Sequence, residues 1–333
     1  MVGTGGAAVA EAETRADRPR RGRTAPLIAA LVLGLGLVAA PAVFQMFSRA
    51  PKGGDMLDGF RPYMTEAKVA EFQGYLGTID EGAVETEDQV ERDAEASVDL
   101  GAGGFADQYP LVAEFEDQWP AIDADMSDML DTMERNLDNY AAVDALPPFD
   151  LFPWFFVLPG LIIAGLAAAT LLARRRGRSS RTLVVLLGVM GLGLIAAPAV
   201  FQMFTRAPEG KEMIDDFRLL MTEEKVRTIQ GYFLTIGSGE GQLRLNVLPD
   251  LETAGDETTY PAVGEFSEEW PTINNEFAPM IGAMSDNVEN YEAVDALPPF
   301  TLFPWFFVVP GVLVIAFAFF AWPRRDPAHD LER

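Results

Sequence analysis

Hydrophobic residues are gathered into four long runs that contain no charged side chain. The runs span residues 26–47, 151–173, 182–204 and 302–322. Each is about as long as the ~20 apolar residues that a helix needs to cross a bilayer. In hydrocarbon only a helix satisfies its own backbone hydrogen bonds, so each run is expected to be helical. The pattern predicts an all-α integral membrane protein with four transmembrane helices.

The polar segments between these runs carry the periodicity of amphipathic helices. Thr65 is a candidate N-cap, and Val69, Phe72 and Leu76 follow it at helical spacing. A later apolar stripe with steps of three and four residues predicts one long helix. That stripe comprises Ile122, Met126, Met129, Leu130, Met133, Leu137 and Tyr140.

Two stretches lack this periodicity. Residues 80–108 are acidic and contain glycine, and residues 237–259 hold the corresponding place later in the chain. Both predict solvated loops. The only strand-like pattern is a weak one at Gln242–Leu248. We therefore expect the polar segments to form two small all-helical bundles.

An internal repeat organises the whole chain. Three motifs occur twice: AAPAVFQMF at 39–47 and 196–204, AVDALPPF at 142–149 and 293–300, and LFPWFFV at 151–157 and 302–308. Arg49-Ala50-Pro51 likewise matches Arg206-Ala207-Pro208. Each copy is span, outer segment, span. Two spans per copy leave both copies in the same orientation, which predicts tandem parallel repeats about a pseudo-twofold axis along the membrane normal.

The predicted domain order follows from the spans and the repeat. It is a disordered Arg-rich N-terminus (1–25), repeat 1 (26–173, with outer helical domain 48–150), a basic loop (174–181), repeat 2 (182–322, with outer helical domain 205–301) and a tail (323–333). We expect each apolar stripe to pack against apolar residues either of earlier helices in its own copy or of the other copy.

Charge is partitioned sharply between the segments. Residues 48–150 carry 25 acidic and 6 basic side chains, and residues 205–301 carry 19 and 6. Arginines cluster before the first span, between the second and third, and after the fourth. Basic residues near span ends stay on the cytoplasmic side. We expect a multi-pass plasma-membrane protein with cytoplasmic termini and extracytoplasmic acidic domains. A cleaved signal peptide is the rival interpretation of the first span, but its residues recur in the third.

Composition removes several classes of chemistry. The chain has no cysteine, and its one histidine, His329, lies in the polar tail. Disulfides, thiolate nucleophiles and Cys-ligated zinc are excluded, and imidazole chemistry loses its usual residue. No phosphate-binding loop or nucleophile elbow is present. We expect no catalytic residue, no metal site, no cofactor and no nucleic-acid binding.

Two weaker site interpretations arise from side-chain clusters. The acidic run Asp123, Asp125, Asp128, Asp131 and Glu134 suggests calcium, but it lacks the spacing and glycine of an EF-hand, and the second copy has lost most of the charge. A solvated helix face is favoured. Met126, Met129 and Met133 suggest a soft metal, but they share a stripe with Ile and Leu, so core packing is favoured.

Paired polar and aromatic residues are the candidate interaction residues. Arg61 and Arg218 are cations in an acidic field, suited to a lipid headgroup or, preferably, to an ion pair within the domain. Gln45 and Gln202 are predicted to hydrogen-bond between helices near the outer ends of the odd spans.

Four tryptophans complete the candidate set. Trp154 and Trp305 lie in aromatic clusters at the start of the even spans, which predicts anchoring at the membrane interface. Trp119 and Trp270 lie on the apolar faces of the outer helices. Small residues such as Gly34, Gly36 and Ala164 predict close helix packing within the membrane.

Longer motifs carry a resemblance. MFSRAPKGGDMLDGFRPYM, YPLVAEFEDQWP and ALPPFDLFPWFFVLPG resemble a group of uncharacterised multi-pass membrane proteins of actinobacteria, once per copy. Some of these proteins carry the label "aromatic ring-opening dioxygenase LigA". Such an enzyme needs imidazole ligands for iron, so that activity is not expected here. The resemblance implies a membrane protein without an assigned activity.

These observations support a non-enzymatic cell-envelope protein whose outer domains bind or sense a ligand or partner. The expected partners are the lipid bilayer and another membrane protein, and a homo-oligomer is compatible with the pattern. The alternative is an accessory or lipid-handling component of a transport system, with a path between the two repeats. A cavity of lipid size between the repeats would favour that alternative.

Overall fold

The computed structural model describes residues 24–322, and every regular element in them is helical. The predicted Arg-rich N-terminus up to residue 23 and the tail from residue 323, with His329, lie outside the described residues. The described chain divides into two compact units. The first contains the described residues up to Phe44, Pro153–Phe201 and the described residues from Pro304. The second contains Gln45–Phe152 and Gln202–Phe303.

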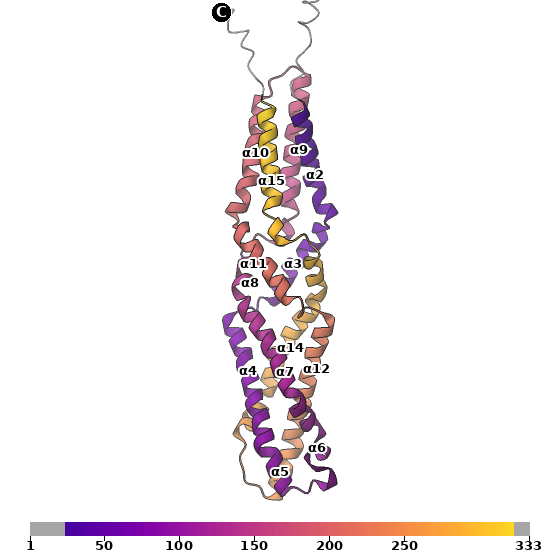
Figure 1. Ribbon diagram of the computed structural model, residues 1–333, viewed down its shortest axis with the longest axis vertical. Coiled ribbons are helices and arrows are strands. Elements are labelled where there is room, and N and C mark those ends of the chain that lie inside the picture. The colour runs from indigo at the N-terminus through magenta and orange to yellow at the C-terminus, as the bar shows by residue number, and fades with distance from the viewer. Residues whose placement is uncertain (1–23, 323–333) are drawn as a thin grey trace, which may run out of the picture. The chain divides into compact units, whose positions relative to one another are not determined.

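The first unit is a ring of four apolar helices, all long and apolar enough to cross a membrane. Helix α2 packs on α9, α10 packs on α15, and the contacts α9–α10 and α2–α15 close the ring (Figure 1). Large apolar side chains face outward, such as Val32 and Leu192 at 63% and 61% exposure. An exposed surface of this kind suits lipid and not water. The helices are α2 (Ala25–Val43), α9 (Trp154–Arg175), α10 (Arg181–Val200) and α15 (Trp305–Phe320).

Small residues set the distance between paired helices in this unit. A Cβ atom added at Gly34 would lie 2.7 Å from the carbonyl oxygen of Gly160 and 2.7 Å from the backbone nitrogen of Ala164. In the other pair, a Cβ at Gly191 would lie 2.8 Å from the Gly311 oxygen. The predicted close packing is confirmed at Gly34 and Ala164. It is wrong at Gly36, where a Cβ would meet nothing within 4 Å.

The odd spans end earlier than the hydrophobic pattern predicts. Helices α2 and α10 end at Val43 and Val200, and Gln45 and Gln202 adopt left-handed backbone with φ of 54° and 53°. A new helix begins after each glutamine. Pro41 lies two residues before the end of α2 and has no N–H to continue the hydrogen-bond ladder. The shared motif AAPAVFQMF therefore contains a helix break, and because the motif is almost entirely apolar the hydrophobic pattern does not indicate it.

The second unit contains the helices between the apolar spans of both copies. From the first copy come α3 (Met46–Phe60), α4 (Glu66–Glu85), α5 (Glu91–Ser97), α6 (Gly104–Gln108), α7 (Pro110–Arg135) and α8 (Leu137–Asp144). From the second come α11 (Met203–Phe217), α12 (Glu223–Gln242), α13 (Leu248–Ala254) and α14 (Pro261–Asp295). Single-turn π-helices η1 (Thr86–Val90) and η4 (Leu243–Val247) and 3-10 turns η2 (Gly101–Gly103), η3 (Phe149–Leu151) and η5 (Phe300–Leu302) link them.

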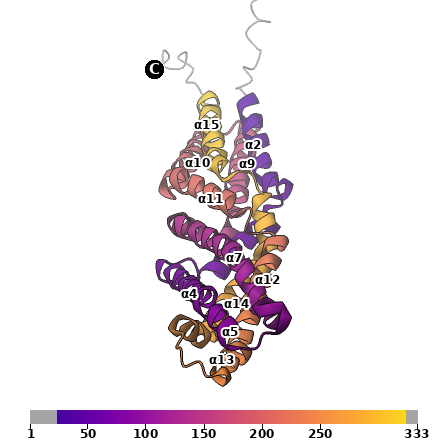
Figure 2. The same cartoon turned by 60° about the horizontal axis from the view of Figure 1, so that its bottom comes forward.

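The two copies exchange helices in this unit, so the prediction of a separate bundle for each copy is wrong. Helix α3 packs against α14 of the other copy, and α11 packs against α8 of the first. Helices α4, α7, α12 and α14 then pack together in one core (Figure 2). A large part of each apolar stripe packs against helices of the other copy, which is one of the two packing arrangements expected from the sequence.

Polar contacts across the copies come in reciprocal pairs. The Lys68 Nζ lies 2.8 Å from the Glu276 Oε2, and Lys225 pairs with Asp125 at the corresponding place. These ion pairs join the copies, and the Lys68 Nζ also lies 2.8 Å from the Glu71 Oε2 of its own helix. Other reciprocal hydrogen bonds join Tyr109 with Asp250, Tyr260 with Asp93, Arg49 with the Ala296 carbonyl, and Arg206 with the Ala145 carbonyl.

Each long helix is capped by the other copy. The buried Glu85 accepts a hydrogen bond from the Val263 backbone N–H at 2.8 Å, in the first turn of α14. Gln242 accepts from the N–H groups of Leu111 and Val112 at 2.8 and 3.1 Å, in the first turn of α7. The first N–H groups of a helix lack partners within it, so each copy completes a helix of the other.

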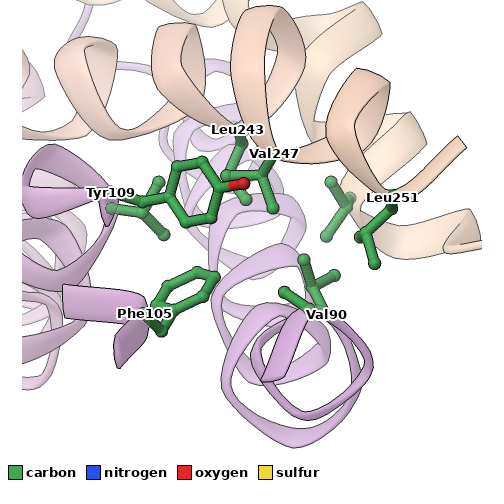
Figure 3. Close-up of a cluster of buried hydrophobic side chains, with 9 residues drawn as sticks. Val90, Phe105, Tyr109, Leu243, Val247 and Leu251 are labelled. Atoms are coloured by element: carbon green, nitrogen blue, oxygen red, sulfur yellow. The ribbon is translucent and has the colours of Figure 1, made fainter. Parts of the chain in front are cut away.

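The two predicted loops are mostly helical. Helix α4 continues through η1 into α5, and α12 continues through η4 into α13, so neither a loop nor a strand lies at Gln242–Leu248. Residues 80–108 are rich in good helix formers such as Ala and Glu. Their apolar residues form a buried cluster between the copies, with Val90, Phe105 and Tyr109 facing Leu243, Val247 and Leu251 (Figure 3). The sequence of one segment alone does not show that its apolar residues pack against the other copy.

Substitution of Gly34 tests the helix spacing in the first unit. Gly34→Leu is expected to destabilise the protein by about 2 kcal/mol, because its side chain would force two backbones apart. Gly36→Leu, two residues away in open space, is the matched control and should change the stability little. Thermal unfolding of the purified protein in detergent measures the difference. Equal effects of the two variants would contradict the packing.

Candidate functional site

The most distinctive cavity in the second unit lies between the two copies. Its lining comprises Met56, Leu57, Phe60, Met64, Met129, Met133 and Tyr140 from the first copy, and Met213, Ile214, Phe217, Leu220, Met221, Met280, Met284 and Tyr291 from the second. The cavity volume is about 50 Å³, and the cavity is partly open to solvent. We refer to it as the methionine chamber. Seven positions recur in both copies, so the repeat itself builds the site.

Methionine dominates this lining. Eight of the chain's 13 methionines contribute to it. An unbranched thioether side chain adapts to irregular shapes and is frequent on surfaces that accept varied apolar ligands. The preferred interpretation of Met129 and Met133 as core packing holds only in part, because both are buried and both line the chamber. Met126 is buried and is not part of the lining.

The two tyrosines in the lining turn their polar ends away from it. The Tyr140 hydroxyl donates to the Leu57 carbonyl oxygen at 2.6 Å, and Tyr291 donates to that of Ile214. Burial raises the pKa of Tyr140 to about 12, so its hydroxyl remains protonated as a donor. Every other lining residue is apolar. The chamber therefore offers an apolar surface and no free polar group to a ligand.

A second cavity continues along the same helices. Its volume is about 30 Å³, and it is lined by Val143, Leu146, Phe149, Phe152, Met203, Arg206, Ala207, Gly210, Phe300 and Phe303. We refer to it as the arginine chamber. On α11 the two linings form one stripe with steps of one and three residues, from Met203 to Phe217. The chambers therefore follow each other along one helix face.

The space beside the glycine that lines the arginine chamber differs between the two copies. At Gly210 an added Cβ would lie 3.1 Å from Val143 and 3.6 Å from the ring of Phe300. At the corresponding Gly53 it would lie 2.9 Å from the ring of Phe149. The Phe149 ring fills the space beside Gly53 more completely than Phe300 fills the space beside Gly210.

The candidate cations Arg61 and Arg218 are held in ion pairs. The Arg61 Nη2 lies 2.7 Å from Asp58 and 2.9 Å from Asp144. Arg218 makes the corresponding pairs with Asp215 and Asp295. Hydrogen bonds to Asp58 and the charge of Asp144 raise the pKa of Arg61. The preferred interpretation, an ion pair within the domain, matches this geometry, and the headgroup role does not.

The paired glutamines have a backbone role. The side chains of Gln45 and Gln202 are exposed, and each carbonyl oxygen accepts from the hydroxyl of the residue three positions later, Ser48 or Thr205. Neither side chain makes the predicted bond between helices within residues 24–322. Their importance lies in the left-handed conformation that separates the spans from the outer helices.

The tryptophans divide into two kinds. Trp154 and Trp305 begin α9 and α15 and are 46% and 53% exposed, as an interfacial anchor requires. Trp119 is buried and donates its Nε1–H to Asp80 at 3.0 Å. Trp270 stacks on Phe233 with ring centroids 6.0 Å apart. Trp119 and Trp270 are packing residues of the second unit.

Arg49 and Arg206 were not among the residues predicted to form the site. Each donates to a backbone carbonyl of the other copy, at 2.9 and 2.8 Å, and neither forms an ion pair with any carboxylate in the described chain. The signal was present in the recurrence of Arg-Ala-Pro in both copies. Of the two arginines, only Arg206 lines the arginine chamber.

A metal site finds no support in the described residues. No group of three or more His, Asp or Glu side chains with metal-binding geometry occurs within residues 24–322. In the acidic run proposed for calcium, Asp125 instead pairs with Lys225 and accepts from the Tyr232 hydroxyl at 2.8 Å. The acidic run belongs to a helix face and to the contact between copies.

Comparison of the sequence with protein-family models finds no match, and comparison with curated proteins also finds none. The functional argument therefore depends on the geometry of the two chambers and on the residues around them.

One buried carboxyl group remains outside these features. Glu116 on α7 has a buried Oε1 without a hydrogen-bond partner among the described residues. Burial, and then the neighbouring charges of Glu91 and Glu87, raise its pKa to about 7. At a pH between the ordinary pKa of a glutamate and about 7, the Glu116 carboxyl is protonated in the folded protein but ionised in the unfolded chain. The stability contribution is present at low pH and is lost as the pH rises toward 7.

Glu116→Gln is expected to remove part of the pH dependence of stability. At about pH 8 the variant should be more stable than the wild type by about 1 kcal/mol, allowing for solvent screening, and near pH 4 the two should be similar. Thermal unfolding across this range measures the effect. Glu114→Gln, on the exposed side of the same helix, is the matched control. A parallel pH profile for wild type and Glu116→Gln would contradict the assignment.

Proposed function

We propose that this chain is a non-enzymatic membrane protein of the cell envelope whose outer helical unit binds an apolar ligand. The observation that carries the proposal is the methionine chamber, an apolar cavity built from equivalent residues of both copies. Ligand sites are concave and mostly apolar. The eight flexible methionines supply a surface that adapts to a hydrocarbon ligand.

Binding is a better match to this site than catalysis. The lining has no carboxylate, amine or aliphatic hydroxyl, and its two phenol groups are committed to backbone carbonyls. General acid–base and nucleophilic catalysis both need a reactive side chain within reach of the substrate. The chamber offers shape and apolar surface, which are the properties of a binding or carrier site.

The topology proposed here places the outer unit outside the cytoplasm. The Arg clusters adjoining the spans favour cytoplasmic termini and a cytoplasmic middle loop. Parallel tandem repeats account for the reciprocal contacts, such as Lys68 with Glu276 and Lys225 with Asp125. The four spans would anchor the unit in the plasma membrane and present it to lipids or to a membrane-protein partner.

A lipid-handling role within a transport system is the second candidate function. It is favoured by the position of the chamber between the two repeats, which is where a path for a hydrophobic molecule was expected. It shares the binding step with the first proposal and differs in the fate of the bound molecule, which would be passed on to another component of that system.

Filling the methionine chamber tests the proposal. The double variant Met133→Phe with Met284→Phe should lose most of the lipid that co-purifies with the protein, about tenfold, because two larger rings occupy the cavity. Mass spectrometry of organic extracts from protein purified in mild detergent measures this loss. Met126→Phe, a buried methionine outside the chamber, is the control. Equal lipid content in the wild type and the double variant would contradict the proposed function.

A further inference from the structure

Helix α12 and the turn that follows it differ in charge from the equivalent segment of the first copy. Residues 225–249 contain three basic residues and one acidic residue, whereas the equivalent residues 68–92 contain two basic and seven acidic residues. The one acidic residue, Glu240, is buried and accepts a hydrogen bond from the Arg244 Nε at 2.8 Å. Residues 225–249 therefore present no carboxylate to solvent, in a protein whose net charge is −25.

The same face of α12 and η4 exposes two large apolar side chains. Leu234 is 73% exposed and Leu245 is 62% exposed. Between and beside them lie Gly231, Ser238 and Gly241, and a Cβ added at either glycine would meet nothing within 4 Å. We refer to these five residues as the leucine face. It is an apolar surface without a partner in the chain itself.

Helix α4 has an exposed face at the equivalent positions, with a different surface. It consists of Gly74, Gly77, Glu81 and Val84, all exposed, and we refer to it as the acidic face. An added Cβ at Gly74 or Gly77 would meet nothing within 4 Å. On both helices these positions follow one another at steps of three and four residues, which places them on one side of a helix. The acidic face therefore has open space at Gly77, where the leucine face has Leu234.

The two faces are complementary in shape when the helices lie parallel with equivalent residues at one level. Leu234 then lies opposite Gly77, and Val84 lies opposite Gly241. Facing helices pack closely when a large side chain on one meets a small residue on the other. Two chains inserted in one membrane with the same orientation, as proposed above, would present their helices in this parallel arrangement.

Charge selects the same combination of faces. The serine and arginine at Ser238 and Arg244 replace the carboxylates of Glu81 and Glu87 at the equivalent positions. Contact between two acidic faces would bring like charges together, which is unfavourable. Contact between a leucine face and an acidic face sets Ser238 opposite Glu81 and Arg244 opposite Glu87. Exposed ion pairs contribute little on their own, so burial of the leucine and valine side chains supplies most of the affinity.

We infer that copies of this chain associate head to tail, with the leucine face of one chain packed on the acidic face of the next. Helices α4 and α12 lie at opposite edges of the second unit in both views (Figures 1 and 2), so one chain can contact two neighbours at once. A contact between two different faces leaves one of each kind free at the ends, and it continues into a row or closes into a ring. The methionine chamber takes no part in this contact.

Disulfide cross-linking in the membrane tests the association directly, because the chain has no cysteine of its own. Full-length chains with Gly77→Cys and with Leu234→Cys carry different tags and are produced together in one cell membrane, which gives them the same orientation. A disulfide needs Cβ atoms about 4 Å apart, so mild oxidation should link the two variants at least about tenfold more than a control pair. The control pair is Glu114→Cys with Glu265→Cys, equivalent exposed positions on α7 and α14.

Each other outcome overturns the inference. Yields no higher than those of the control pair would show that the two faces do not meet. Cross-linking of Leu234→Cys chains with one another, without cross-linking to Gly77→Cys, would show a dimer through two leucine faces instead. The double variant Met133→Phe with Met284→Phe should cross-link as the unfilled chain does, so failure of the proposed function leaves this inference intact.

A charged side chain in the leucine face tests the apolar contribution. Leu234→Asp is expected to weaken association about tenfold, because it places a carboxylate against an acidic surface. Energy transfer between two labelled populations of the full-length chain in lipid vesicles, at several protein densities, measures this change. Leu219→Asp is the matched control, since Leu219 is also strongly exposed and lies outside α12. Equal effects of the two variants would contradict the assignment of the leucine face.

Discussion

The exchange of helices between the two copies is the constraint on which the second unit depends. Helix α3 lies on α14 and α11 on α8, so neither copy buries its apolar stripes alone. Equivalent phenylalanines meet across the copies, with Phe115 and Phe266 stacked at 6.0 Å between centroids. Beside them Gly82 and Gly239 approach so closely that an added Cβ would lie 2.8 and 2.5 Å from the Cβ atoms of Phe266 and Phe115. These contacts fix the register of the whole unit.

The chambers are a consequence of this packing. Where the copies meet through Phe, Ile and Val the core is filled, and where they meet through methionine and a few aromatic residues a space remains. The polar atoms nearest to that space are satisfied by the backbone, as with Tyr140 and Leu57. The interface between the repeats therefore both holds the unit together and supplies its candidate site.

Much of the fold follows from local patterns in the sequence. Four uncharged runs predict the apolar helices, and Thr65 and Thr222 cap α4 and α12 through the N–H groups of Lys68 and Lys225. The errors arise where the deciding partner is distant. The segments predicted as loops are helical because Val90 packs against Leu243 and Val247 of the other copy. The helix break at Gln45 lies inside an apolar run, where only the backbone dihedral angle reveals it.

The site was harder to predict than the fold. The methionine stripe was recognised and assigned to packing, because a stripe on one helix does not show whether the facing residues fill the space. The cations Arg61 and Arg218 drew attention by recurring in both copies. Arg206 recurs as well, with Arg49, but only the three-dimensional arrangement shows that it donates to a backbone carbonyl of the other copy and that its side chain lines a cavity.

The difference between Gly53 and Gly210 has a consequence for how such a site evolves. In a dimer of identical subunits every substitution occurs twice, so a cavity on one side of the axis is always matched by a cavity on the other. Here both halves belong to one chain, and the Phe149 and Phe300 rings stand at different distances from their glycines. A single substitution can therefore widen one half and leave the other closed. Two equivalent half-cavities can thereby come to differ in shape within one chain.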